Sequence, residues 1–268
     1  MSGPAKHTKD FAATARATPR HGNVLSMRSE LSPVDLSTVQ EKVYQSLRLA
    51  LLKGQFFPGE QVSIRSLANA LGTSPMPVRE AVKRLVAEKG LEQSSDRLLR
   101  VASYVGSVHE EYIRIRIQVE GFATEKACQS DDPLLIDRLK QHNKSMFDAL
   151  HSSNLESALE ANQAFHFEIY KAATYPQLLD IISNLWLRTG PILAISRHDK
   201  DFFQKIFDIG YRVHNEAIEA IARRDRASAK RAIALDIKAA HLSIRRYYKS
   251  ANVDAVHPVL AQLKQSNS

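Results

Sequence analysis

The stretch from Ser74 to Val82 strongly limits the fold of its surroundings. It follows an apolar-periodic segment that ends at a Gly72-Thr73 break, and it begins a second amphipathic segment. We expect Ser74 to accept hydrogen bonds from the free N–H groups of the new helix, and Pro75 suits a first helical position, where no N–H is needed. Two short helices joined by a glycine-containing turn, the second of them rich in basic residues, are typical of a protein that reads the DNA major groove.

The segments on either side predict the rest of a small DNA-binding domain. Apolar residues at three- and four-residue spacing indicate an earlier helix, which Gly54 would end in a left-handed cap. Ser63 can cap the middle helix, and the helix that begins at Pro75 is expected to stop near Gly90. Residues 91–101 then predict two short strands around a turn. The expected domain, residues 37–103, is a winged helix-turn-helix.

The distribution of charge supports a polyanionic partner for this first domain. The chain has a net charge of +8 and a pI near 9.5. Residues 37–103 carry 10 basic and 6 acidic side chains, whereas residues 104–250 carry 21 and 19, so the surplus per residue is larger in the first domain. A single cysteine, Cys128, excludes an internal disulfide. Because neither a membrane-length apolar run nor a signal-peptide core is found, we expect a cytoplasmic protein.

Residues 104–250 show helical periodicity and no strand pattern. The breaks between the apolar-periodic runs are short, which predicts an antiparallel bundle and makes the expected fold mainly α. The expected helices cover roughly residues 107–129, 132–151, 154–173, 176–191, 199–224 and 226–248.

Both ends of the chain lack a sustained apolar period. Residues 1–36 are rich in Ser, Thr, Ala and Pro, which predicts a disordered N-terminal arm, and residues 251–268 are interpreted as a C-terminal tail. The arm is either an inert tail or a segment that contacts DNA, and the sequence leaves both interpretations open.

The residues of the helix-turn-helix motif resemble those of a known family. Its residues Ser74 to Ala81 are similar to the pattern Ser-Arg-x-Pro-Val-Arg-Glu-Ala of the GntR family of bacterial transcriptional regulators, and the turn after the first helix matches the family's Gly-x-x-x-Pro-Gly. Within the bundle, three segments resemble the FadR-type ligand-binding domain called FCD. They are Arg116-x-x-x-Glu120, Phe165-His166 and Asp225-x-x-x-Ala229. The resemblance covers residues 37 to about 248.

The resemblance implies which residues contact DNA. Arg79 is expected to read guanine, because its planar fork can pair with O6 and N7 together. The sequence departs from the family pattern at Pro75, where the family has arginine, and at Leu98, where the family has a wing glycine. Both departures weaken the expectation that this chain shares the family's operator preference. They do not change the expected fold. The implied DNA contacts are Arg65, Ser74, Met76, Arg79 and Arg97.

The resemblance also implies a metal site in the bundle. The family has an Asp-x-x-x-His pair and two later histidines, and here the matching residues are Asn162, His166, His214 and Asp236. Positions i and i+4 share a helix face, so the first two can converge on one ion. Imidazole and oxygen donors suit Zn, Ni, Mn or Fe without selecting among them. The alternative is a hydrogen-bonded polar pocket without a metal.

An effector site is expected beside the metal. Arg116 matches a family arginine that can face the same cavity, and a guanidinium next to a cation suits a small carboxylate. Arg197 and Tyr211 are further candidates for the cavity wall, whereas Trp186 is interpreted as core packing.

Together these features predict a transcription regulator that responds to a ligand. We expect a repressor that binds an inverted-repeat operator as a homodimer, and whose affinity for DNA changes when the bundle binds an effector. One alternative is a metalloenzyme that uses the bundle His/Asp site, although the sequence has no nucleophile elbow, phosphate loop or clear general base. Another is non-specific DNA packaging, which the nearly neutral bundle disfavours.

Overall fold

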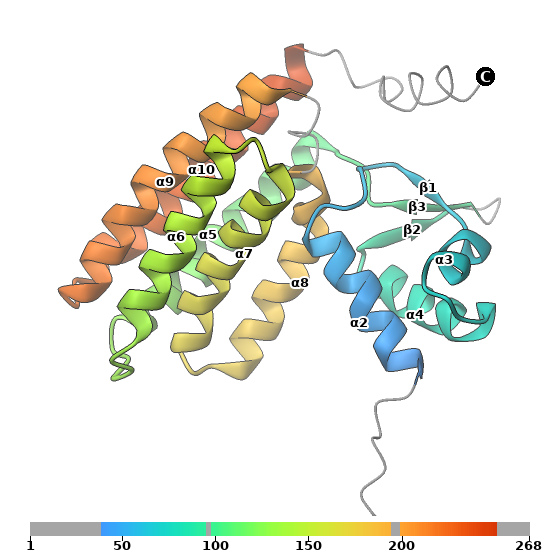
Figure 1. The fold of residues 1–268 in the computed structure, drawn as a ribbon, viewed down its shortest axis with the longest axis horizontal. Coiled ribbons are helices and arrows are strands. Elements are labelled where there is room, and N and C mark those ends of the chain that lie inside the picture. The colour runs from blue at the N-terminus through green and yellow to red at the C-terminus, as the bar shows by residue number, and fades with distance from the viewer. Residues whose placement is uncertain (1–38, 95–97, 194–198, 251–268) are drawn as a thin grey trace, which may run out of the picture. The chain divides into compact units, whose positions relative to one another are not determined.

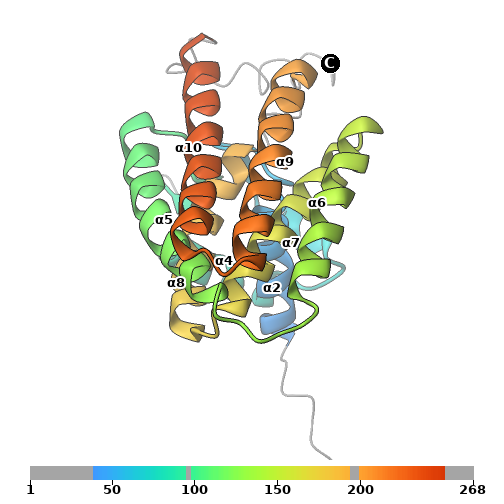
Figure 2. The same ribbon diagram turned by 90° about the vertical axis from the view of Figure 1, so that its left-hand side faces the viewer.

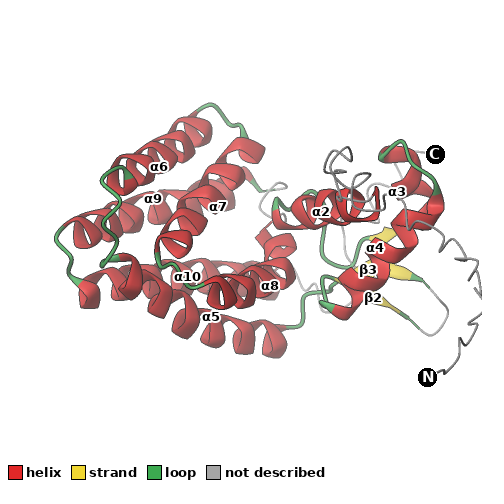
Figure 3. Ribbon diagram, turned by 90° about the horizontal axis from the view of Figure 1, so that it is seen from below, coloured by secondary structure: helices red, strands yellow, loops and turns green. Residues whose placement is uncertain are grey.

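The computed structural model describes residues 39–94, 98–193 and 199–250, which belong to one compact unit. This part is mainly helical with a small three-stranded sheet (Figures 1 and 3), as the sequence predicted. The predicted arm (1–36) and tail (251–268) lie outside the described residues, and the proposed domain boundaries stay predictions. Within the described ranges, no helix is long and apolar enough to cross a membrane.

The N-terminal domain has the order helix, strand, two helices and two strands. It consists of α2 (Val39–Leu52), β1 (Gln61–Val62), α3 (Ile64–Ala70), α4 (Pro75–Ala87), β2 (Leu91–Gln93) and β3 (Leu99–Val101). The sheet order is β1-β3-β2, and both pairings are antiparallel, with Leu91 opposite Val101. The buried faces of α2 and α4 and the wing strands share one apolar core, which includes Leu47, Leu51, Val78 and Leu85. This arrangement is a winged helix-turn-helix.

Of the two N-terminal helix caps predicted for this domain, the structure confirms one and contradicts the other. Ser63 forms a full capping box with Ser66 at the start of α3. The prediction that the Ser74 side chain caps α4 is wrong, because it makes no cap hydrogen bond. An N-cap serine bonds the N–H of the second or third helical residue, and the third is Pro77, which has no N–H, so only the N–H of Met76 is available.

The end of α4 also differs in detail from the expectation. Helix α4 ends at Ala87, three residues before Gly90, and Lys89 has the positive φ of 61°. Gly90 is required for a different reason, since a Cβ atom there would lie 2.8 Å from Cγ of Leu187. Its missing side chain therefore makes room for a leucine from the bundle.

The C-terminal domain is a bundle of antiparallel helices (Figure 2). They are α5 (Gly106–Ala127), α6 (Leu135–His151), α7 (Leu155–Ala172), α8 (Pro176–Leu193), α9 (Lys200–Ala222) and α10 (Arg226–Ser250). Helix α10 packs between α9 and α5, and α6 packs against α7 and α9. The bundle has two apolar cores, one around Phe165, Ile169 and Ile233 and the other around Met146, Leu159 and Phe207.

Local capping explains the short connections of the bundle. Asn154 and Asp199 accept hydrogen bonds from the first turns of α7 and α9. Positive φ angles at Ser153, Thr174 and Arg224 reverse the chain after α6, α7 and α9. The breaks therefore lie where the sequence predicted, although α6 begins at Leu135 and α8 continues past Pro191. The two-residue strand β1 was not predicted, because its partner β3 is about 40 residues away and so short a strand has no visible alternation.

Helix α8 joins the two domains within this compact unit. Its Leu187 is fully buried in the winged-helix core, and its Arg188 Nε donates to the backbone carbonyl of Glu88 at the end of α4, at 3.0 Å. A Cβ atom on Gly190 would lie 3.1 Å from the carbonyl oxygen of Leu52 in α2. Three residues within four positions of one helix therefore contact the DNA-binding domain.

Candidate DNA-binding surface and effector cavity

The exposed face of the helix-turn-helix carries the arginines that the sequence singled out. Arg65 on α3 and Arg79 on α4 are exposed, and Met76 is 65% exposed at the start of α4. Among the described residues, neither arginine has a carboxylate partner. By contrast, Lys83 pairs with Glu80 at 2.7 Å, and Arg84 pairs with carboxylates on two helices. The unpaired guanidinium groups keep their full charge for a phosphate or a base edge.

The other two predicted DNA contacts have different outcomes. Ser74 is exposed at the N-terminus of α4, where its hydroxyl is free of a capping role. Arg97 lies in the wing tip, outside the described residues.

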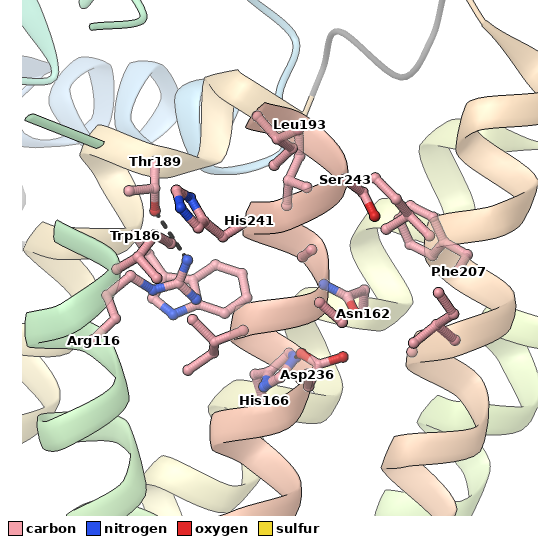
Figure 4. Close-up of a pocket in the computed structure, with 18 of the residues that line it drawn as sticks. Arg116, Asn162, His166, Trp186, Thr189, Leu193, Phe207, Asp236, His241 and Ser243 are labelled. Carbon is pink, nitrogen blue, oxygen red and sulfur yellow. Dashed lines mark hydrogen bonds and ion pairs between the residues drawn. The ribbon is translucent and has the colours of Figure 1, made fainter. Parts of the chain in front are cut away.

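The bundle encloses a small polar cavity (Figure 4). It is lined from α5, α7, α8, α9 and α10 and has a volume of about 50 Å³. Figure 4 shows His166 and Asp236 side by side at one end of the cavity, and Arg116, Thr189 and His241 together at the other. The volume limits the ligand to a small molecule.

Three of the four predicted metal ligands converge at the first end. Atoms of His166, His214 and Asp236 lie within 4.8 Å of one another. The Nε2 atom of His166 is 3.2 Å from one carboxylate oxygen of Asp236, and Nε2 of His214 is 3.6 Å from the other. Asn162 lines the same cavity one helical turn before His166, and Asp236 lines it too, whereas the fully buried His214 lies behind this wall.

Hydrogen bonds to the far side of each ring orient both histidines. The carbonyl oxygen of the Asn143 side chain accepts from Nδ1 of His214 at 3.1 Å, because its amide nitrogen already donates to Asn215 and to the carbonyl of Tyr211. The Tyr170 hydroxyl donates to Glu120 and therefore accepts from Nδ1 of His166. In a neutral ring, the other nitrogen is then an acceptor.

These assignments leave acceptors facing one another across the site. Burial lowers the pKa of His214 to about 3, so the ring is neutral and its Nε2 carries no proton. This atom is buried without a hydrogen-bond donor among the described residues. Burial opposes the charge of Asp236, but its pKa stays below its usual value, so the group is a carboxylate. A carboxylate and a bare imidazole nitrogen 3.6 Å apart fit a shared cation.

The second end of the cavity holds a buried ion pair. Arg116 donates to both carboxylate oxygens of Glu120, which is fully buried, and its third bond goes to the Thr189 hydroxyl at 3.3 Å. Burial opposes the charge of Arg116, but the adjacent Glu120 raises the pKa of the guanidinium. The same guanidinium lies 4.7 Å above the ring of Trp186. Arg116 thus borders the cavity as expected, but the carboxylate of Glu120 already neutralises its charge.

The remaining effector candidates lie elsewhere. Tyr211 packs its ring against Phe147 at 4.6 Å and is not among the described residues that line the cavity. Arg197 lies outside the described residues. Trp186, interpreted from the sequence as core packing, is buried and also forms part of the cavity wall.

Sequence reasoning missed several residues of the site. Glu120 and Tyr170 connect His166 to Arg116, and Asn143 orients His214 from α6. Glu120 entered the sequence analysis only as part of a family motif. Its bond to Tyr170 spans 50 positions and that of Asn143 to His214 spans 71, so no local spacing marks them. His109 and His241 also line the cavity.

Comparison with known families agrees with both domains. A model described as "Bacterial regulatory proteins, gntR family" matches residues 39–97, and one described as "FCD domain" matches residues 111–264. The second match alone spans more than half of the 268 residues.

Individual relatives are regulators too. The sequence is 29% identical over 150 residues to the HTH-type transcriptional regulator McbR of Escherichia coli (strain K12), covering 56% of this chain and 68% of the relative. It is 23% identical over 228 residues to the HTH-type transcriptional repressor RspR of the same organism, covering 83% and 95%. The solved structure of E. coli McbR/YncC matches the fold with a TM-score of 0.72 at 23% identity, covering 79% of this chain and 99% of that one. The chain therefore belongs to the GntR family of bacterial transcription regulators that carry an FCD domain, and not to a family of enzymes.

Proposed function

We propose that this regulator is a repressor that binds an inverted-repeat operator as a homodimer, and that a small carboxylate effector in the bundle cavity changes its affinity for DNA. The observation that carries this proposal is the position of helix α8. Its Thr189 bonds Arg116 at the cavity, while the neighbouring Leu187 and Arg188 contact the winged-helix core and the end of α4. A ligand that displaces Arg116 would act directly on the helix that supports the DNA-binding domain. The name of the relative RspR supports repression.

Exposed apolar side chains support the homodimer. On α5, Val108, Ile115 and Phe122 recur every seven residues and are 42%, 39% and 39% exposed. On the adjacent α10, Leu235 and Leu242 repeat the same spacing at 49% and 48%. A stripe of this kind over two packed helices is typical of an interface between subunits. Ile115→Glu should shift the sedimentation of the protein toward the monomer, whereas Lys140→Glu on α6 should not.

The metal proposal rests on the acceptors that face one another. His166, His214 and Asp236 would hold a divalent ion such as Zn, Ni, Mn or Fe, with Asn162 as a weaker fourth ligand. Because Arg116 is matched by Glu120, the charge of Asp236 alone would repel an anion from the cavity. The bound ion would supply the positive charge that a carboxylate effector needs.

DNA binding is tested first at the recognition helix. Arg79→Ala should abolish specific operator binding while the bundle stays folded, because the exposed guanidinium has no structural partner among the described residues. Arg114→Ala, which removes an exposed arginine from α5, is the matched control and should leave the operator footprint unchanged. An Arg79→Ala protein that protects the same operator with unchanged affinity would show that α4 is not the reading helix.

The metal and effector are tested together. Protein purified without chelator is analysed for metal, and its melting temperature is followed with a panel of small acids. Asp236→Ala should lower both the metal content and the stabilisation by acids, whereas Asp180→Ala, which removes an exposed carboxylate from α8, should change neither. Wild-type protein that carries no stoichiometric metal, and that added metal does not stabilise, would make the site a plain polar pocket.

A further inference from the structure

A second polar cluster lines the cavity away from the metal candidates. It consists of His109 on α5 and His241 on α10, whose ring centroids are 5.2 Å apart. Figure 4 shows His241 beside Thr189 and the guanidinium of Arg116, at the opposite end from Asp236. The predicted metal and effector residues include neither histidine, so the cluster needs an explanation of its own.

The ring nitrogens of this cluster lack partners. His109 is 3% exposed and His241 is 6% exposed. Within the described ranges, nothing hydrogen-bonds to either ring nitrogen of His109 or to Nδ1 of His241. Buried polar atoms are nearly always satisfied, because leaving one unpaired is costly. Three unpaired nitrogens in the wall of one cavity therefore indicate a ligand group that bonds them.

The electrostatics of the cluster define that group. Burial, together with His241 and Arg116, lowers the pKa of His109 to about 3, so the ring is neutral. Burial also lowers the pKa of His241. A neutral imidazole offers one donor and one acceptor, which a hydroxyl group can satisfy together. A second carboxylate would find no free positive charge there, because Arg116 is bound to Glu120.

We infer that His109 and His241 form a second binding subsite of the cavity, and that the effector is a small hydroxylated acid. Its carboxylate binds at the end of His166, His214 and Asp236, and a hydroxyl group at the other end bonds the histidine pair. The inference rests on the proposed function, since it needs an acid in the cavity. It adds the chemical class of the ligand and the residues that select it.

The subsite also adjoins the DNA-binding domain. His109 lines a second hollow, whose wall includes Val86 at the end of α4, Leu91 on β2 and Arg188 on α8. A hydroxyl group bound to His109 would therefore lie one side chain away from the wing and the recognition helix. This position makes the hydroxyl contact suited to regulation as well as to selection.

The test compares acids that differ by one hydroxyl group. Calorimetric titration of the metal-loaded protein uses 3-hydroxypropionate, 4-hydroxybutyrate and 5-hydroxypentanoate, each beside its deoxy partner propionate, butyrate or pentanoate. We expect the best hydroxylated acid to bind at least about tenfold more tightly than its partner, because a site with unpaired hydrogen-bonding groups discriminates against the analogue that lacks the hydroxyl. His241→Leu and His109→Leu should reduce this preference to about onefold and change the affinity of the deoxy acid by less than about threefold.

The controls separate this inference from the proposed function. His142→Leu on α6, outside the cavity wall, should keep the preference for the hydroxylated acid. Without ligand, His241→Leu should melt at the same temperature as the wild type or higher, because it removes an unpaired buried nitrogen; a large drop would mean that His241 is structural. The conservative His241→Gln tests the contact if His241→Leu does not fold. Acids that bind with no preference for the hydroxyl overturn the subsite alone, and the absence of binding by every acid overturns the proposed function as well.

Discussion

The winged helix and the bundle use their interiors in opposite ways. Of the described residues, nine polar or charged ones other than tyrosine and tryptophan are classed as buried, and all nine lie in the bundle. The winged-helix core is built from apolar side chains and Tyr44, and its candidate functional residues, Arg65, Met76 and Arg79, are exposed. A domain that reads a large ligand such as DNA needs a rigid support beneath its surface. A domain that encloses a small ligand must carry its polar groups inside, where each one has to be satisfied.

The largest expected effect comes from the buried ion pair of the bundle. Glu120→Ala leaves the Arg116 guanidinium buried without its carboxylate, so the free energy of unfolding should fall by about 4 kcal/mol. Urea unfolding measures the change. The double variant Arg116→Met/Glu120→Leu should recover most of the loss, since it leaves no unpaired charge. A loss below about 1 kcal/mol in the single variant would mean that water reaches the pair and that the bundle interior is less closed than we describe.

Removal of a side chain from the winged-helix core should have a somewhat smaller effect. Leu187 is fully buried among the apolar residues of that core although it belongs to bundle helix α8. Leu187→Ala should cost about 3 kcal/mol, from lost burial and from the cavity that remains. It should also loosen the domains from each other, so that the effector has less influence on operator binding. Normal coupling in a destabilised Leu187→Ala protein would contradict a role for α8 in communication.

A pH titration sharpens the comparison, because all the buried histidines in the described part of the chain lie in the bundle. His109 has its pKa lowered from 6.5 to about 3 in the folded protein, so the unfolded chain binds the extra proton as the pH falls below 6.5. Stability should therefore fall with pH over this window, with His109 contributing a loss of about 2 kcal/mol between pH 7 and pH 5. Denaturant unfolding at both pH values measures this loss, and His109→Leu should reduce it. An equal pH dependence in the variant would mean that His109 is charged or solvated in the fold.

The smallest expected effect on stability is at the recognition helix. Met76 is 65% exposed, so Met76→Ala should change the free energy of unfolding by no more than about 0.5 kcal/mol. Operator binding is expected to weaken, because this side chain is on the surface that we propose enters the groove. Thermal melting and a DNA-binding titration on the same sample measure the two effects. A large loss of stability would show that the surface of the winged helix contributes to its fold.

The outcome for individual residues shows where sequence patterns are reliable. The helices of both domains were predicted, since periodicity, proline and local caps such as Ser63 act within a few residues of each other. The prediction of the Ser74 cap is wrong, and Pro77 at the third helical position removes one of the two N–H groups that such a cap can bond. The strand β1 could not be predicted, because only its pairing with β3 defines it.

In the candidate site, too, some features were predicted from the sequence and others were visible only in the structure. His166, His214 and Asp236 were selected by their match to a family pattern, and the fold brings them within 4.8 Å of one another. The match could not reveal that Arg116 also bonds Thr189, or that Tyr170 and Asn143 turn both Nε2 atoms toward Asp236. The bonds of Arg116 to Thr189, of Tyr170 to Glu120 and of Asn143 to His214 each join two helices, and their distances depend on how the helices pack.

The sequence by itself determined the elements of this protein and its family, because helix periodicity, turn residues and the motif around Arg79 are local properties of the chain. It also determined that the surplus of basic residues per position is larger in residues 37–103 than in residues 104–250. Only the tertiary structure decided which polar groups are satisfied and which are left unpaired, since the bond of Tyr170 to Glu120 and the open nitrogens of His109 and His241 depend on helices far apart in the chain. Hydrogen bonds act over about 3 Å, so only the packed helices can determine which distant residues form them.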